Sequence, residues 1–348
     1  MIPLISKITL AKDRPKSGFA EGFNIQSKLK MLSEASGGRI AEFIGNDSFA
    51  KQFYERQRYE VEAGRDAEPI LYTPLYNITT DGTLPRNVTI YTLGPAGVVF
   101  EEITEGGEVK FVSVGEGTKS VQIRHYATGI QYTKDIFLFN ELFRLSNFER
   151  QFGVAFNALM NHLHFAPILT YSYAAANQTN GTTLTTFRQT ASMPEKYLRT
   201  IEKAMTDGVA DTTNPRRGPY ILICNTADVF TFERALGRVP QEGFDLQSSA
   251  IGRIQGIIEY NGWTGTRGKK TTTYSGVTSG KAYLVDIGNR IYDFQSYVKQ
   301  PLQMTMGNPD VSRFIMEQNV WDTYFGVFAD PARAVQEITV PTATSGQA

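Results

Sequence analysis

One segment of this 348-residue chain predicts an unusually long helix. Its apolar residues recur at steps of three, four or seven, which places them on one face of a helix. These residues are Leu138, Leu142, Leu145, Phe148, Phe152, Ala155, Phe156, Leu159 and Leu163. The pattern predicts a helix from about Asn140 to His164, with Pro167 just beyond its end. At 1.5 Å per residue it would be about 35 Å long, so we expect a spine along which other elements pack.

The segment before this helix predicts a two-stranded ribbon. Residues 106–114 mix apolar with polar residues, and Gly115-Glu116-Gly117 predicts a turn. Residues 121–128 then alternate with a period of two, with Val121, Ile123, His125 and Ala127 on one side and Gln122, Arg124, Tyr126 and Thr128 on the other. Because a ribbon of two strands is only marginally stable in water, it needs a further surface, either from its own body or from another molecule.

The rest of the chain predicts a mixture of helices, strands and loops. The predicted elements are an irregular arm at 1–21, an interrupted helical region at 24–62 that leads into a charged, solvated stretch at 51–66, extended segments at 70–103, a helix at 192–208, a buried strand at 220–225 and a mobile surface loop at 264–280. Ser192 is a candidate N-cap for the second helix, and a third helix is capped near Asn225 or Thr226 and closed by Gly237. Residues 216–310 predict a compact α+β unit.

The charges and the single cysteine exclude several classes of protein. Lys+Arg and Asp+Glu number 35 each, so the net charge is zero, which argues against a dedicated nucleic-acid binder. Cys224 lies in the apolar run YILICN, which predicts a core residue and not a nucleophile. No window reaches the ~20 apolar residues of a membrane span, and no secretory signal begins the chain. We therefore expect a soluble protein made in a cytoplasm, without membrane contact.

No motif predicts catalysis, a metal or a cofactor. The stretch GWTGTRGKKT resembles a phosphate loop, but Lys270 stands where the hydroxyl residue should be, and a flexible basic loop is the better interpretation. His162 and His164 are two residues apart on a helix, so they point to different faces, and no Cys, His or carboxylate cluster has metal-ligand spacing. No nucleophile-elbow sequence occurs. We expect a structural protein, not an enzyme.

The order of these elements resembles that of a known family. Residues 111–143 (FVSVGEGTKSVQIRHYATGIQYTKDIFLFNELF) look like an extended loop that enters a spine helix. Residues 220–237 look like the strand-then-helix step of an axial domain, and residues 318–340 look like a closing strand and turn. The chain thus resembles the major capsid protein of tailed bacteriophages, the Hong Kong 97-type fold, in element order over most of its length.

The resemblance implies an α+β fold with an N-terminal arm, an extended β loop, a peripheral domain with a long spine helix, and an axial domain. The implied boundaries are 1–65 for the arm and helical region, 66–95 for peripheral strands, 96–130 for the extended loop, 131–215 for the peripheral domain with the spine, 216–310 for the axial domain, 311–340 for return strands to the peripheral domain and 341–348 for a tail.

The resemblance also implies a function. The chain would be a major capsid protein that self-assembles from pentamers and hexamers into an icosahedral shell around double-stranded DNA, without sequence-specific binding. The ribbon would lie across the adjacent subunit, with intersubunit contacts from Lys110, Phe111, Glu116, Lys119 and Arg124. The location would be the virion, after assembly in the cytoplasm of a host bacterium.

Other partners and one alternative follow from the same resemblance. Only about 90 residues precede the ribbon, so the resemblance implies a separate scaffolding protein, or none. It also implies separate portal and decoration proteins. The arm carries Lys7, Lys12, Arg14 and Lys16 against Asp13 and Glu21, which is too weak a positive charge to gather a genome. The shell is therefore expected to assemble empty. The alternative is an encapsulin, a bacterial compartment of the same fold that holds enzyme cargo.

Overall fold

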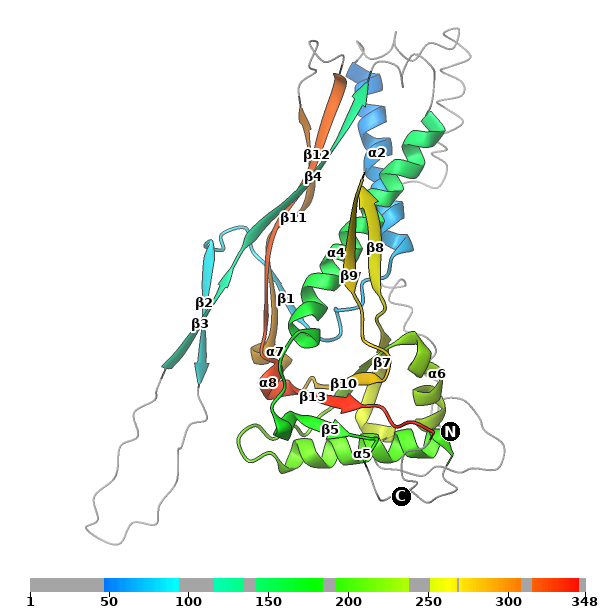
Figure 1. Ribbon diagram of the computed structural model, residues 1–348. Helices are drawn as coiled ribbons and strands as arrows, with labels where there is room; N and C mark the ends of the chain where they lie inside the picture. Colours follow the sequence, from blue (N-terminus) through cyan, green and yellow to red (C-terminus); the bar gives the residue numbers. More distant parts are fainter. Residues whose placement is uncertain are drawn as a thin grey trace, which may run out of the picture.

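The computed structural model describes residues 47–93, 116–133, 142–183, 192–237, 251–267, 269–307 and 315–343. Figure 1 shows an elongated arrangement, with two long helices and a long sheet above a compact mixed unit, and with a two-stranded ribbon projecting to one side. The predicted arm at 1–21 and the first part of the helical region lie outside the described residues.

Two long helices pack against each other at a pair of glycines. Helix α2 spans Asp47–Ala67 and helix α4 spans Leu142–Leu169. A Cβ atom on Gly153 would lie 2.1 Å from the carbonyl oxygen of Val61, and one on Gly64 would lie 2.0 Å from that of Arg150. Only residues without a side chain permit this approach of the two backbones.

Helix α4 is the predicted spine, but its end and its buried face differ from the prediction. It runs through Pro167 to Leu169, because a proline in the last turn removes only one backbone hydrogen bond. The predicted apolar stripe is largely half-buried from Phe152 onward. The fully buried positions include the polar residues Asn157 and Asn161.

Asparagines of α4 bind the chain that leaves α2. The side-chain amide of Asn157 donates to the carbonyl oxygens of Arg65 and Glu68, at 2.6 and 2.8 Å. Asn161 donates to the Pro69 carbonyl and accepts from the Leu71 N–H. The bond to Arg65 satisfies one of the last carbonyls of α2, which would otherwise lack a partner, and the other bonds hold the segment that follows the helix. The sequence predicts that the stretch 51–66 is solvated. This prediction is wrong for Arg56, Gln57 and Glu60, whose side chains are buried.

A four-stranded sheet lies along α4. Its order is β1-β11-β12-β4, formed by β1 (Asn77–Thr80), β11 (Phe294–Gly307), β12 (Ile315–Ala329) and β4 (Arg124–Thr133). β1 is parallel to β11, and the other pairs are antiparallel. Phe165 of α4, Phe294 of β11 and Phe325 of β12 are fully buried in the shared core.

A five-stranded sheet forms the compact unit. Its order is β5-β13-β10-β6-β7, formed by β5 (Gln178–Asn180), β13 (Val335–Thr339), β10 (Lys281–Asp286), β6 (Tyr220–Cys224) and β7 (Ile254–Glu259). Helices α5 (Met193–Ala210) and α6 (Thr226–Ala235) pack with this sheet in a second cluster of buried apolar residues, separate from the core around α4. Both predicted caps are confirmed: Ser192 accepts from the Glu195 N–H, and Asn225 accepts from the Ala227 N–H.

Four short helical turns complete the described part of the fold. They are η2 (Ala175–Asn177), η3 (Ile251–Arg253), α7 (Arg290–Asp293) and α8 (Pro331–Ala334). Two of them, α7 and α8, connect the two sheets. The sheet pairing cuts across the predicted domain boundaries in three places. Helix α5 packs on the five-stranded unit, not on the spine, β11 pairs with β12 in the other sheet, and β13 pairs with β10. The partners of β13, which are α5 and β10, lie far from it in sequence, so no local pattern predicts these contacts.

The predicted mobile loop at 264–280 is wrong in its first half. β8 (Gly262–Arg267) and β9 (Lys270–Ser275) form an antiparallel hairpin. Its β-branched threonines suit a strand, and the Thr264 and Thr273 hydroxyls face each other across it. The Tyr274 ring stacks on His162 of α4 at 4.4 Å. Because Lys270 begins a strand and not a helix, the phosphate-loop resemblance has no structural counterpart.

Candidate assembly interface

The projecting ribbon consists of β2 (Asn87–Leu93) and β3 (Glu116–Gln122), which are antiparallel. The predicted turn at Gly115-Glu116-Gly117 is wrong, because Glu116 pairs with Leu93 and Gly117 with Thr92 within the strands. Residues 94–115 between the strands lie outside the described residues. After a single-residue break at Ile123, the chain continues from β3 into β4, so the ribbon and the four-stranded sheet share one continuous segment (Figure 1).

The root of the ribbon has a small apolar core of its own. Ile90 of β2, Val121 of β3 and Phe328 of β12 form a buried cluster, and Tyr297 packs against it. A Cβ atom on Gly326 would lie 2.9 Å from both the Gln122 carbonyl oxygen and a Val121 methyl carbon. The absence of a side chain at Gly326 therefore lets the ribbon lie directly on β12.

Lys119 holds the root of the ribbon against the body through an ion pair with Asp330. Its Nζ lies 2.6 Å from the Asp330 carboxylate and 5.6 Å from the centre of the Phe328 ring. The Lys119 side chain is 45% exposed and that of Asp330 only 12% exposed, so the carboxylate is the more desolvated partner. The Asp330 N–H donates to the backbone carbonyl of Asp293, which joins α8 to α7 beneath the ribbon.

Asp293 lies in a crowded electrostatic environment below this ion pair. Burial raises the pKa of Asp293 to about 6, the Arg333 guanidinium lowers it in part, and the Asp330 and Asp286 carboxylates raise it further. The Arg333 nitrogen is 3.5 Å from the Asp293 carboxylate. Charges from β3, α7, α8 and β10 thus meet where the ribbon joins the body.

The predicted contact residues lie in different places. Lys110 and Phe111 are outside the described residues, and Glu116 takes part in β3 by its backbone pairing with Leu93. Lys119 binds within its own chain. Arg124 is exposed at the start of β4, where it pairs with Phe325. The intersubunit role of these five residues stays a prediction.

Sequence patterns missed a set of exposed apolar side chains. Those at least 40% exposed are Tyr59, Ile78, Tyr171, Val209, Phe230, Ile291, Tyr292 and Val320. Phe230 of α6 is 67% exposed. Its neighbours Val229 and Phe232 face the core, so α6 has apolar residues on two faces. Because only one face of a short helix packs against the core, the second apolar face could have indicated a contact surface.

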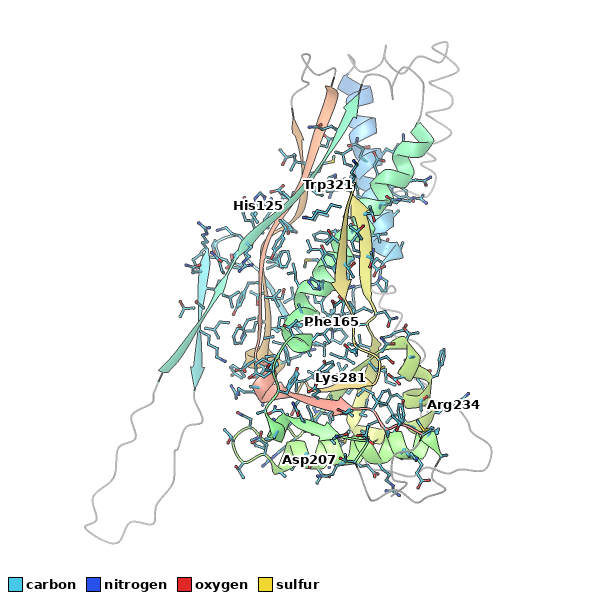
Figure 2. The ribbon with its side chains drawn as sticks, in the orientation of Figure 1. His125, Phe165, Asp207, Arg234, Lys281 and Trp321 are labelled. Atoms are coloured by element: carbon cyan, nitrogen blue, oxygen red, sulfur yellow. The ribbon has the colours of Figure 1, made fainter. Side chains whose placement is uncertain are left out.

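In the described part of the chain, Cys224 and His164 are fully buried and belong to the core. Burial raises the pKa of the Cys224 thiol to about 12. Burial also lowers the pKa of His164 to about 4, and its ring lies between the Met160 carbonyl and the Ser296 hydroxyl. His162 stacks on Tyr274, so the two histidines have separate partners. His125, labelled in Figure 2, stacks on Tyr324 at 4.2 Å.

Metal-binding clusters and membrane-spanning helices are both absent from the described part of the chain. No group of three or more His, Cys, Asp or Glu side chains there could hold a metal ion. No helix there is both long and apolar enough to cross a membrane.

No family model matches the sequence, and no curated protein matches it either. Solved structures do match. A virus-like particle protein from Pyrococcus furiosus is similar with a TM-score of 0.53 and 13% identity, over 82% of this chain and 99% of that chain. The capsid protein of cyanophage P-SCSP1u has a TM-score of 0.50 and 10% identity, over 78% and 88% of the two chains.

A third similar structure is the mature capsid of bacteriophage PhiM1, with a TM-score of 0.50 and 11% identity over 78% of this chain and 87% of that chain. At these identities the likeness concerns the fold. It confirms the predicted α+β, Hong Kong 97-type capsid fold, with the long helix α4, the projecting ribbon and the mixed unit as its parts.

Proposed function

We propose that this chain, which has the Hong Kong 97-type capsid fold, is the major capsid protein of a tailed bacteriophage. Its copies would assemble as pentamers and hexamers into an icosahedral shell around double-stranded DNA. The observation that carries the proposal is the ribbon β2–β3, which projects from the sheet that it shares through β4. The described part of the chain offers this ribbon no second sheet to cover it along its length.

The physical reason is the geometry of a closed shell. Each copy must present different patches to different neighbours, so the contacts are heterologous. A stable interface needs about 1,000 Å² or more, and a protruding ribbon adds area that flat edges lack. We infer that Lys110, Phe111, Glu116, Lys119 and Arg124 contact the next copy. Lys119 would also aim the ribbon by binding Asp330 of its own chain.

The same proposal covers location and partners. The protein would be part of the virion, after assembly in the cytoplasm of a host bacterium, with separate scaffolding, portal and decoration proteins. A chain with 35 acidic and 35 basic residues offers no net attraction for nucleic acid, so DNA would enter a preformed shell, driven by a motor made of other proteins. Its role would be structural and not enzymatic.

Replacing the ribbon's outer part tests the proposal. Residues 95–114 are exchanged for a short Gly-Ser linker, which keeps the pairing of β2 with β3 and the root cluster. The variant should remain folded, with the wild-type circular dichroism spectrum, yet form no closed shells in sedimentation velocity or negative-stain images. Shells of wild-type size and yield would overturn the ribbon's role.

The contents of the particles separate the capsid from the compartment alternative. Particles produced in cells that also express the genes neighbouring this one in its native genome should contain double-stranded DNA of one defined length. A protein cargo, identified by mass spectrometry in place of DNA, would favour the encapsulin alternative instead.

A further inference from the structure

Helix α6 presents an apolar knob to solvent. Ala227, Phe230 and Arg234 are exposed and lie at spacings of three and four, on one face of the helix. The opposite face, with Val229 and Phe232, is buried in the five-stranded unit. A phenylalanine side chain has 150–250 Å² of surface to bury, so Phe230 is the largest single contribution that this face can make to a contact.

A hollow lies on another side of the same unit. It has a volume of about 280 Å³, is open to solvent, and is lined by Ala175, Ala176, Gln178, Asp207, Ala210 and Asp211. Three of these residues are alanines, and the exposed Val209 adjoins Ala210 in the chain. A cavity of about 150 Å³ is enough to hold a benzene ring, so this hollow is large enough for a phenyl group.

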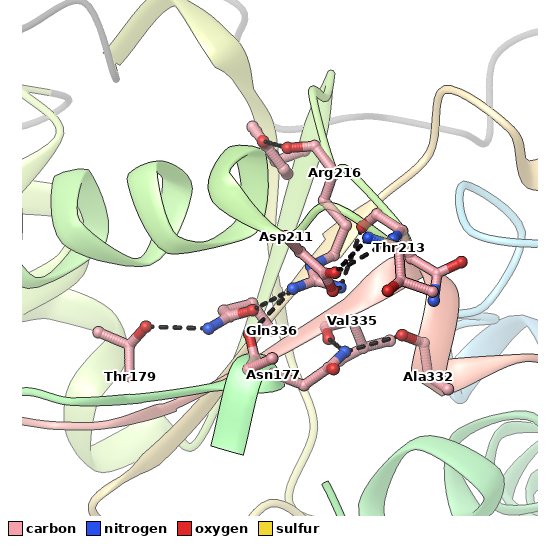
Figure 3. A network of polar contacts seen from close by, with 11 residues as sticks. Asn177, Thr179, Asp211, Thr213, Arg216, Ala332, Val335 and Gln336 are labelled. Carbon is pink, nitrogen blue, oxygen red and sulfur yellow. Dashed lines mark hydrogen bonds and ion pairs between the residues drawn. The ribbon is translucent and has the colours of Figure 1, made fainter. Parts of the chain in front are cut away.

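A buried arginine holds the walls of the hollow in place (Figure 3). Arg216 donates to the Asp211 carboxylate at 3.0 Å, to the Ala176 carbonyl at 3.1 Å and to the Gln336 side chain at 2.9 Å. Gln336 donates in turn to the Thr179 hydroxyl. The three walls, from η2, β5 and the end of α5, are thereby tied to β13. A preformed hollow loses little conformational entropy when it is filled.

The knob and the hollow lie at opposite edges of the five-stranded sheet. Helix α6 packs against β7, which is one edge, and Gln178 of the hollow belongs to β5, which is the other. Figure 2 shows Arg234 and Asp207 on opposite sides of the unit. One chain therefore cannot fill its own hollow. A contact between opposite flanks of successive copies is heterologous, and it closes into a ring when the rotation between copies closes.

We propose that Phe230 of each copy seats in the hollow of the next copy, between Ala176 and Ala210, around the ring of a pentamer or hexamer. This inference rests on the proposed function, because that function supplies the ring. Arg234, one helical turn after Phe230, then comes to the acidic rim formed by Asp207 and Asp211.

The charges at the rim suit this partner. Burial alone would raise the pKa of Asp211, but the N–H groups of Asn214 and Thr213 and the Arg216 guanidinium hold it below its ordinary value, so the carboxylate is ionised at neutral pH. Asp207 accepts from Thr179 and from Lys203, whose side chain is about half exposed. In the proposed contact, Arg234 of the neighbouring copy adds a second exposed cation beside the carboxylates of Asp207 and Asp211.

A disulfide between copies tests the contact in assembled full-length protein. The double variant Phe230→Cys/Ala210→Cys is oxidised mildly and run on a denaturing gel without reductant. Native Cys224 can stay, because it is buried. We expect a ladder of linked chains that ends at five or six copies and collapses with reductant. Each single variant should remain monomeric on the gel.

A matched control places the second cysteine elsewhere on α5. Arg199 is exposed but lies about 16 Å along the helix axis from Ala210, and a disulfide needs Cβ atoms about 4 Å apart. The pair Phe230→Cys/Arg199→Cys should therefore give no ladder. If wild-type shells form but the Ala210 pair gives none, the docking is wrong and the capsid function stands. If the wild-type chain forms neither shells nor rings, the proposed function itself fails.

A second measurement does not depend on cysteines. Phe230→Ala should raise the concentration at which half of the protein is assembled by about tenfold or more, as loss of a central aromatic contact does. Phe230→Leu, which keeps an apolar side chain for the hollow, should stay within about threefold of wild type. An unchanged midpoint for Phe230→Ala would contradict the proposal.

Discussion

A Cβ atom on Gly153 of α4 would lie 2.7 Å from the carbonyl carbon of Gly64 in α2. The two helices thus meet backbone to backbone, at a distance that no side chain permits. The asparagines of α4 then bind the Arg65 carbonyl at the end of α2 and the Pro69 carbonyl just beyond it, so the crossing point and the polar contacts together set how the two helices lie.

Gly153→Ala should destabilise the protein by about 1–3 kcal/mol. Helix propensity alone would favour alanine by about 1 kcal/mol, so a loss of stability reports the clash with α2. Urea unfolding of the unassembled chain, followed by circular dichroism, measures the effect. Gly256→Ala in β7 is the control, because a Cβ there meets nothing within 4 Å. A Gly153→Ala midpoint at or above that of wild type would show that the helices do not cross so closely.

Lys119→Met should disturb assembly more than stability. Methionine keeps an apolar chain over Phe328 but leaves the Asp330 carboxylate without its cation. Since Lys119 is nearly half exposed, we expect a loss of only about 1 kcal/mol in the free energy of unfolding. The yield of closed shells should fall severalfold, because the ribbon's direction is less fixed. Lys270→Met, at an exposed lysine of β9, should change neither. Equal shell yields for the two variants would contradict an aiming role for Lys119.

Asp293 should make stability depend on pH. Its pKa in the folded protein is about 6, above the ordinary 3.8, so the folded state binds the proton more tightly than the unfolded state. The free energy of unfolding therefore rises as pH falls from above 6 towards 4. Asp293→Asn should be more stable than wild type by about 2–3 kcal/mol at pH 8, and the difference should vanish below about pH 4.

Urea midpoints of both proteins across this range test the assignment, and Asp81→Asn is a control of opposite sign. Hydrogen bonds from the backbone and hydroxyl of Thr83 lower the pKa of Asp81, so its contribution is lost as pH falls. A constant difference between wild type and Asp293→Asn from pH 4 to pH 8 would show that Asp293 is not the titrating group.

Assembly should need no nucleic acid. Because acidic and basic residues balance, attraction to phosphates cannot drive the formation of a shell. The purified chain, treated with nuclease, should form the same particles as an untreated sample, with no steep loss as salt is raised. Particles that appear only after DNA or RNA is added would contradict an empty precursor.

The sequence predicts elements with strong local patterns and misses those decided by distant partners. The apolar repeat predicts α4, and the caps Ser192 and Asn225 place two further helices. Gly153 and Asn161 carry no such signal, because glycine and asparagine are poor helix formers whose value here depends on α2 and on the segment that follows it. The threonines of β8 and β9 suit a polar loop and a strand equally well until the register pairs them.

The candidate interface was predictable to a similar extent. Alternation around Val121 predicts a ribbon, yet a Gly-x-Gly sequence also predicts a turn, and pairing with β2 places that sequence in a strand instead. Lys119 looks like a free surface charge because its partner Asp330 follows more than two hundred residues later. Phe230 reads as a core residue, because only the packing of α6 reveals which of its two apolar faces is covered.

Cryo-electron microscopy of the particles formed by the full chain tests the central claim most directly. The account predicts closed icosahedral shells built from rings of five and six copies, in which each ribbon β2–β3 lies across the neighbouring copy. A chain that remains monomeric at every concentration, or that forms only open or irregular assemblies, would contradict it.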